Sequence, residues 1–248
     1  MIIGVNGKIG SGKDTVGKII QYLTSECGNS NSSRHRTYAE FLKRGGGSNL
    51  RNFDQHYVSD WEVKKFAGKL KTTASLLTGI PVEKFEDQEF KKLEMPECWN
   101  RLQQSGRSKV WAPMTYRQFL QELGTEAMRE GLHTNVWVNA LLADYKSQPN
   151  KEVAEFLAAE GLPQSMNGGE KNYPNWIITD MRFYNEMEAV VEKGGITIRV
   201  VRQGTVLSNH PSETSLDKHG MHYEIINDGT IEDLVEKVRT ILIKENII

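Results

Sequence analysis

Apolar runs and amphipathic stretches alternate along the chain, and this alternation predicts an α/β fold. The runs typical of buried strands are 2–6, 61–67, 176–180, 196–201 and 223–227. Stretches with apolar residues at helical spacing lie at 14–25, 70–78, 116–123, 135–146, 151–160, 183–193 and 231–242. Strands separated by helices favour a three-layer sandwich with a mostly parallel five-stranded sheet, a usual size for a sheet. Ligands of such sheets bind where the strands end.

Three stretches lack a clear pattern and interrupt this alternation. Residues 28–55 are rich in Gly, Ser and Asn, and we interpret them as a flexible insertion with a short helix at 37–43. Residues 82–112 are irregular and polar, and they open a mostly helical region that we expect to bind the second substrate, over about 82–175. Residues 203–220 form a polar loop that is a candidate lid. We assign all of 1–248 to one domain.

Composition restricts the class of protein. The formal net charge is −1, with 38% hydrophobic and 25% charged residues, which is typical of a soluble globular protein. This balance disfavours a nucleic-acid binder or a polybasic membrane protein. The chain has no apolar run long enough to span a membrane, and its first residues lack the features of a secretory signal. Its 2 cysteines form no CxxC pair. We therefore expect a cytoplasmic protein, and a homodimer is compatible with these features.

The strongest chemical signal is at residues 7–13, which read GKIGSGK and fit the pattern G-x-x-x-x-G-K between a strand and a helix. Glycines let backbone N–H groups converge on an anion, and the following helix adds the positive end of its dipole. Lys13 can reach the β- and γ-phosphates of ATP. The residues expected to bind ATP are Gly10, Ser11, Gly12, Lys13, Asp14 and Thr15. The fold class is therefore P-loop NTPase-like.

Two carboxylates complicate this site. Asp14 stands where such loops carry Ser or Thr, and Thr15 follows one position late. A carboxylate beside a triphosphate is unfavourable unless Mg²⁺ or a buried role compensates for its charge. Asp180 ends an apolar strand, so it lies beside the loop if the two strands are neighbours. We expect Thr15 and Asp180 to act on Mg²⁺, although Asp180 alone is also compatible with a helix N-cap.

An ordered set of further segments resembles the deoxynucleoside monophosphate kinases of bacteriophages. The matching segments are 12–15 (GKDT), 66–71 (FAGKLK), 117–121 (RQFLQ), 124–129 (GTEAMR), Trp137, 179–186 (TDMRFYNE), 210–213 (HPSE) and 226–230 (INDGT). The resemblance implies transfer of the γ-phosphoryl of Mg-ATP to a deoxynucleoside monophosphate (dNMP), for DNA precursor synthesis in the host cytoplasm. Catalysis then consists of positioning and charge neutralisation, so no general base is required.

The resemblance also assigns roles to residues outside the phosphate loop. The residues that would stabilise the transferring phosphoryl, together with Lys13, are Arg129, Arg182 and Arg202. The residues that would bind the acceptor are Lys71, Arg117, Gln121, Arg129, Trp137, Asp180, Arg182 and Glu186. Arginine suits this work because its planar guanidinium binds phosphate through two hydrogen bonds. Trp137 is equally well explained as a buried core residue. Arg117 is equally well explained as an ordinary surface residue.

Other functions stay open at this point. Another small-molecule P-loop kinase, of the dephospho-coenzyme A or phosphomevalonate kinase type, would share Lys13 and Thr15 and differ in its acceptor pocket. A non-catalytic ATP-binding module would need no second set of arginines, so Arg129, Arg182 and Arg202 argue against it.

Overall fold

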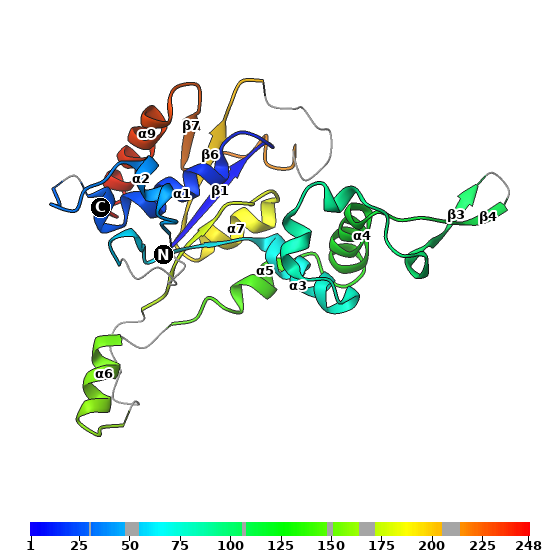
Figure 1. Ribbon diagram of the computed structural model, residues 1–248, viewed down its shortest axis with the longest axis horizontal. Coiled ribbons are helices and arrows are strands. Elements are labelled where there is room, and N and C mark those ends of the chain that lie inside the picture. The colour runs from blue at the N-terminus through cyan, green and yellow to red at the C-terminus, as the bar shows by residue number, and fades with distance from the viewer. Residues whose placement is uncertain (30, 48–54, 106–107, 148–150, 164–171, 205–213) are drawn as a thin grey trace. The chain divides into compact units, whose positions relative to one another are not determined.

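The computed structural model describes residues 1–29, 31–47, 55–105, 108–147, 151–163, 172–204 and 214–248 (Figure 1). The chain forms two compact units. We call Met1–Lys65 with Leu142–Ile248 the sheet unit, and Phe66–Leu141 the helical unit. The assignment of 1–248 to one domain stays a prediction. Among the described residues, none of the helices combines the length and the apolar character needed to cross a membrane.

The sheet unit contains the parallel sheet that the sequence predicts. Its strands run in the order β2-β5-β1-β6-β7, and every neighbouring pair is parallel. The strands are β1 Ile2–Gly7, β2 Trp61–Lys64, β5 Asn175–Ile178, β6 Ile196–Val201 and β7 Tyr223–Ile226. Because β1 lies between β5 and β6, the chain segments that follow these three strands emerge at one edge of the sheet. The predicted α/β sandwich is confirmed.

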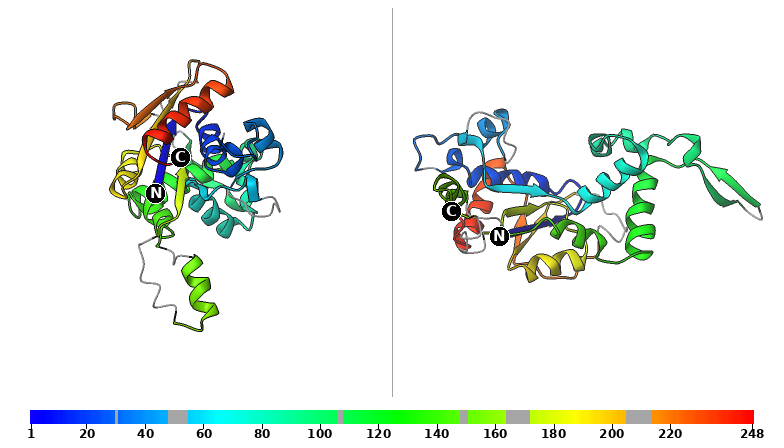
Figure 2. Two further views of the ribbon diagram at one scale, coloured as in Figure 1. Left: turned by 90° about the vertical axis from the view of Figure 1, so that its left-hand side faces the viewer. Right: turned by 90° about the horizontal axis from the view of Figure 1, so that it is seen from below.

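Helices cover both faces of this sheet, as the ribbon views show (Figure 2). The helices of this unit are α1 Lys13–Leu23, α2 Tyr38–Lys43, α6 Lys151–Ala159, α7 Tyr184–Glu192 and α9 Ile231–Lys244. Ile3 and Val5 of β1 belong to the buried core that α1 and α9 complete. The residue between them, Gly4, faces α7, where a Cβ atom would lie 3.3 Å from Val190 Cγ2. Alternate positions of β1 therefore bind the two helical layers to the sheet.

Part of the predicted insertion is packed into the core. The short helix expected at 37–43 is α2, and its N-terminus is fixed by a capping box between Thr37 and Glu40. Phe41 is completely buried and meets the ring of Tyr22 edge-on, with centroids 5.6 Å apart. Residues 48–54 lie outside the described part, so flexibility there stays a prediction.

The helical unit has a separate core. It contains α3 Phe66–Thr78, α4 Tyr116–Glu122, a π-helix at Leu123–Glu130 and most of α5 Val136–Leu142. A capping box is present at the start of α4, where Thr115 Oγ1 accepts from the backbone N–H of Gln118 at 3.2 Å. The buried residues of its core are Ala74, Phe85, Met95, Met114, Tyr116, Phe119 and Leu120.

Two features differ from the sequence interpretation. Residues 82–112 are not wholly irregular, because β3 Arg101–Ser105 and β4 Ser108–Ala112 form an antiparallel hairpin after three 3₁₀ turns, at Val82–Glu86, Phe90–Lys92 and Glu97–Trp99. The hairpin is exposed on both faces, so its residues show none of the alternation that marks a half-buried strand. The run 61–67 is strand only to Lys64, since α3 begins at Phe66.

Candidate functional site

The glycine-rich loop after β1 has the backbone conformation that an anion cradle requires. Gly10 and Gly12 have φ angles of 80° and 101°, in the left-handed region where glycine is favoured. Gly12 is the N-cap of α1, so the first N–H groups of this helix point to the loop. The Ser11 N–H donates to Lys8 O at 3.1 Å and closes the turn. The loop therefore presents a helix N-terminus and exposed backbone donors to one point.

Close packing fixes the loop against the strand ends. A Cβ atom on Gly7 would lie 2.3 Å from Ser11 Oγ and 2.8 Å from Val200 O, so a side chain at this position has no room. Ser11 is completely buried, and its Oγ has no hydrogen-bond partner among the described residues. Contacts with β1 and β6 thus hold the loop in place, and its backbone N–H donors stay available to a ligand.

Asn227 is a further part of the loop that sequence reasoning did not assign to the site. It directly follows β7, and its Nδ2 donates to Ser11 O at 2.8 Å. Its own N–H donates to Val201 O at 2.7 Å, which holds it at the sheet edge. Its position after a strand, at the edge where ligands bind, is the signal that would have indicated it.

Lys8 was also missed, and it connects the loop to the segment 214–220. Its Nζ lies 2.7 Å from Asp217 Oδ2. That segment is fixed in turn by Arg199, whose Nη2 donates to Leu216 O at 2.6 Å and to His219 O at 2.7 Å. Residues 205–213 lie outside the described part, so the lid at 203–220 and a role for Arg202, which is exposed at its start, stay predictions.

The unusual Asp14 is stabilised by two neighbours at the sheet edge. Lys65 Nζ lies 3.0 Å from Asp14 Oδ1, and Thr179 Oγ1 donates to the same oxygen at 2.9 Å. Burial alone would raise the pKa of Asp14. The hydrogen bond and charge of Lys65 outweigh this effect, with help from Thr179 and Lys13, and leave the pKa below its usual value. Asp14 is therefore ionised at neutral pH and is compensated by protein groups.

Asp180 lies beside the loop, because β5 and β1 are neighbours as the sequence argument required. It is 9% exposed. Asn6 Nδ2 of β1 donates to Met181 O at 2.9 Å and joins the two strand ends. Glu186 is almost completely buried, and its Oε2 accepts from the N–H groups of Arg182 (2.7 Å) and Phe183 (3.1 Å). Glu186 therefore fixes the start of α7 and the backbone of Arg182.

The acceptor residues expected in the helical unit differ in their surroundings. Lys71 Nζ lies 2.6 Å from Glu86 Oε1, and Arg117 Nη2 donates to Gln88 Oε1 at 3.0 Å. Gln121 is exposed and Arg129 is half-buried on the π-helix. Trp137 is 5% exposed and its Nε1 donates to Gly124 O at 2.9 Å, which favours the buried alternative for this residue.

Lys91 adds a third cation near Lys71 and Arg117. Burial lowers its pKa, and the charges of Lys71 and Arg117 lower it further, whereas Glu86 and Asp87 act in the opposite direction. Such a group of neighbouring cations suits an anionic ligand. The sequence signal was weak, because Lys91 belongs to the polar stretch in which no motif stands out.

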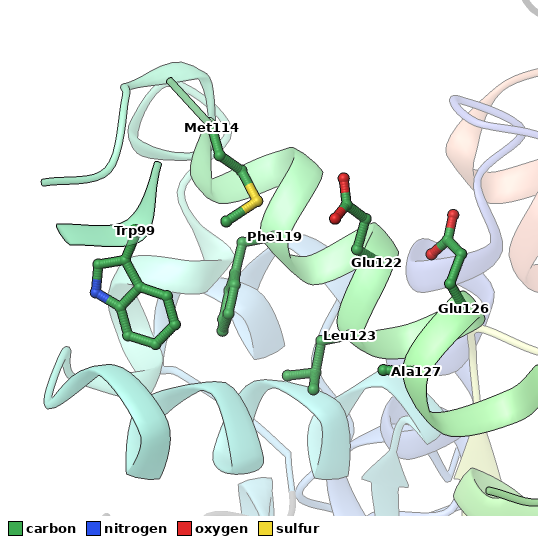
Figure 3. Close-up of a pocket in the computed structure, with 7 residues that line it drawn as sticks. All are labelled: Trp99, Met114, Phe119, Glu122, Leu123, Glu126 and Ala127. Atoms are coloured by element: carbon green, nitrogen blue, oxygen red, sulfur yellow. The ribbon is translucent and has the colours of Figure 1, made fainter. Parts of the chain in front are cut away.

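An open pocket of about 520 Å³ lies on another part of the helical unit (Figure 3). Its lining residues are Trp99, Met114, Phe119, Glu122, Leu123, Glu126 and Ala127. Glu122 forms an ion pair with Arg101 at the base of the hairpin. None of the acceptor residues expected from the sequence belongs to this lining. The pocket is apolar with a carboxylate rim, a chemistry unsuited to a phosphate.

The residues at the loop fit the phosphates of ATP. Gly10 and Gly12 have positive φ angles, and the space beside Gly10 is open, since a Cβ atom there would meet nothing within 4 Å. Lys13 occupies the first helical position, and its Nζ donates to Lys8 O at 3.4 Å. The Thr15 hydroxyl and the Asp180 carboxylate supply oxygen atoms of the kind that Mg²⁺ prefers.

Comparison with known proteins identifies the family. The model of the family "Deoxynucleotide monophosphate kinase" matches residues 71–238. The chain is 23% identical to the deoxynucleoside-5′-monophosphate kinase of Escherichia phage T5, over 92% of this chain and 89% of that protein. It is 27% identical to a putative deoxynucleotide monophosphate kinase of Acanthamoeba polyphaga mimivirus, over 52% of this chain and 61% of that protein. It is also 27% identical to the deoxynucleotide monophosphate kinase of Enterobacteria phage T4, over 51% of this chain and 44% of that protein. These two matches span only about half of the proteins concerned. The matched family model extends over more than half of the chain, which therefore belongs to the deoxynucleotide monophosphate kinase family.

Proposed function

We propose that this kinase transfers the γ-phosphoryl of Mg-ATP to a deoxynucleoside 5′-monophosphate and releases the diphosphate and ADP. The observation that carries the proposal is the anion cradle at 7–13, which lies at the same sheet edge as the carboxylate and arginine that follow β5. An ATP phosphate site beside a second set of phosphate-binding groups is the arrangement that phosphoryl transfer requires. Its partners would be small nucleotides in the host cytoplasm, and a homodimer stays a prediction.

The loop binds the donor nucleotide in this proposal. Backbone N–H groups between Gly10 and Lys13 hold the β- and γ-phosphates, and Lys13 Nζ neutralises the charge that develops on them. Thr15 and Asp180 hold the metal ion and its waters, and Mg²⁺ supplies further neutralisation of phosphate charge when bound.

Arginines hold the acceptor and the transferring group. Arg182, whose backbone Glu186 fixes, binds phosphate oxygens through its guanidinium. By resemblance to the family, Arg129 and Arg202 share this work, and Lys71, Arg117 and Gln121 bind the dNMP. The attacking atom is already a phosphate oxygen, so the protein has only to align it with the γ-phosphoryl.

A coupled ADP-release assay with Mg-ATP tests the proposal. The acceptors are dAMP, dGMP, dCMP, dTMP and 5-hydroxymethyl-dCMP, with AMP, GMP and dephospho-coenzyme A as controls. We expect ADP release that depends on at least one deoxynucleotide. The variant Lys13→Ala should lose this activity, whereas Lys193→Ala should keep it, because Lys193 is exposed after α7 at the opposite edge of the sheet.

The other functions give different results in the same assay. Release that occurs only with dephospho-coenzyme A would indicate another small-molecule kinase. ATP binding without any acceptor-dependent release would indicate a non-catalytic module. Arg182→Ala should raise the KM of the acceptor more than that of ATP, and unchanged kinetic constants would remove Arg182 from the site.

A further inference from the structure

Lys65 is a residue that neither the loop motif nor the family segments assign to the site, and the structure places it at the phosphate loop. It directly follows β2, and its Nζ reaches Asp14 Oδ1 at 3.0 Å. Asp14 is the residue that departs from the usual loop, in the first turn of α1 next to Lys13. The ion pair thus joins the edge of the sheet to the loop at the one position where the loop carries a negative charge.

Asp14 poses an electrostatic problem for a triphosphate site. An Asp side chain at this position carries a negative charge close to the phosphates and repels them. A Ser or Thr in its place would carry no charge and would need no counterion. Lys65 and Thr179 both engage Oδ1, and no hydrogen bond involves Oδ2 among the described residues. Lys65 therefore supplies a positive charge beside a carboxylate that retains one unengaged oxygen.

Structural stability does not explain the pair. The side chains of Lys65 and Asp14 are 35% and 62% exposed, and exposed ion pairs contribute little to stability because water and salt screen them. Thr179 also anchors this edge independently, since its N–H donates to Lys64 O at 3.4 Å. A charge that adds little to folding, next to an anion-binding loop, is better explained by its effect on the anion.

We propose that Lys65 is a positioning residue that neutralises and orients Asp14, so that a phosphate loop with Asp at this position binds a nucleoside triphosphate. The proposal rests on the proposed function, since it takes the loop to be the ATP site. Lys65 acts through Asp14, and its effect falls on nucleotide affinity. A chain with an uncharged side chain at position 14 would not need Lys65.

A double-variant experiment tests this dependence. We expect Lys65→Met to weaken ADP and ATP binding about tenfold, because an uncompensated charge remains at the loop. Lys65→Arg should keep near-normal affinity. Asp14→Asn introduced into Lys65→Met should recover most of the lost affinity, since the charge that required Lys65 is then absent. The measurements are calorimetric titration with ADP and the KM for ATP, with the melting temperature as a check of folding.

Lys64→Met is the matched control. It removes a positive charge from the adjacent residue, the last of β2, where Lys64 pairs with Glu62 at 2.5 Å and not with Asp14. Normal ADP affinity in Lys65→Met would overturn the proposal. So would a loss that Asp14→Asn does not relieve, because Lys65 would then act on the nucleotide directly. ADP affinity is measured without an acceptor, so failure of the dNMP reaction would leave this test readable.

Discussion

Gly12 and Asn227 fix the phosphate loop by contact as well as by conformation. A Cβ atom on Gly12 would lie 2.6 Å from Asn227 Nδ2, the atom that donates to Ser11 O. The glycine is thus required both for its positive φ and for the approach of Asn227. The motif predicts the first requirement. The second depends on a residue more than two hundred positions away, so no local pattern contains it.

Asn227→Ala should loosen the loop without unfolding the protein. Loss of a part-buried hydrogen bond costs about 1 kcal/mol of unfolding free energy, and the freed Ser11 carbonyl no longer holds the loop closed. We expect the KM for ATP to rise more than the KM for the acceptor, as measured in the coupled assay. Asp228→Ala is the control, because it removes only an exposed ion pair with Lys237 (2.9 Å). Equal effects of the two variants would show that Asn227 does not support the loop.

At the scale of elements, the sequence predicted the parts that have a local signal. The strands of the sheet lie in runs that the sequence marked as strands, although β2 and β7 contain charged residues. The helices α4 and α9 begin at 116 and 231, as the helical spacing predicted, and each follows a capping box. The β3–β4 hairpin has no apolar face in its described part, and it was missed. The order of the strands, and with it the approach of Asp180 to the loop, follows from pairing between distant segments.

The start of α7 fixes the backbone of Arg182, a residue proposed to bind phosphate. Glu186 uses its buried carboxylate to hold the two N–H groups that precede the helix. We interpreted it from the sequence as an acceptor ligand because it occurs in the segment TDMRFYNE, and its spacing from Arg182 is equally explained by this capping. An acidic group here also complements the positive end of the helix.

Glu186→Gln should lower both stability and acceptor turnover. The amide oxygen is a weaker acceptor and carries no charge, and we expect the unfolding free energy to fall by about 1–2 kcal/mol in chemical denaturation. Because Arg182 loses its fixed backbone, the KM of the dNMP should rise while ADP affinity changes little. Glu188→Gln, on the exposed face of the same helix, should shift stability by no more than about 0.5 kcal/mol. Unchanged acceptor kinetics in Glu186→Gln would separate the cap from the function of Arg182.

At the scale of the whole molecule, there is one hydrophobic core in the sheet unit and another in the helical unit, and each supports different candidate site residues. The core of the sheet unit contains β1, α1 and α9, which hold the phosphate loop. The core of the helical unit supports α4 and the π-helix, on which Gln121 and Arg129 lie. A π-helix is rare, and such segments are often found at functional sites. The helical stretch expected at 116–123 ends where the π-helix begins, and the sequence contains no signal of the wider turn, which the Trp137–Gly124 hydrogen bond accompanies.

Phe85→Leu should therefore lower dNMP-dependent ADP release without changing the affinity for ADP. Phe85 is completely buried in the helical unit, and the smaller side chain leaves a cavity that costs about 1–2 kcal/mol, less than the ~3–5 kcal/mol of truncation to Ala. The residues proposed to bind the acceptor then lose rigid support, so dNMP-dependent ADP release should fall several-fold. Calorimetric ADP affinity should stay normal, because every loop residue belongs to the sheet unit. Phe156→Leu, at an exposed position of α6, is the control and should change neither property. A parallel loss of ADP affinity in Phe85→Leu would show that the phosphate loop depends on the helical core, and that the two units act as one.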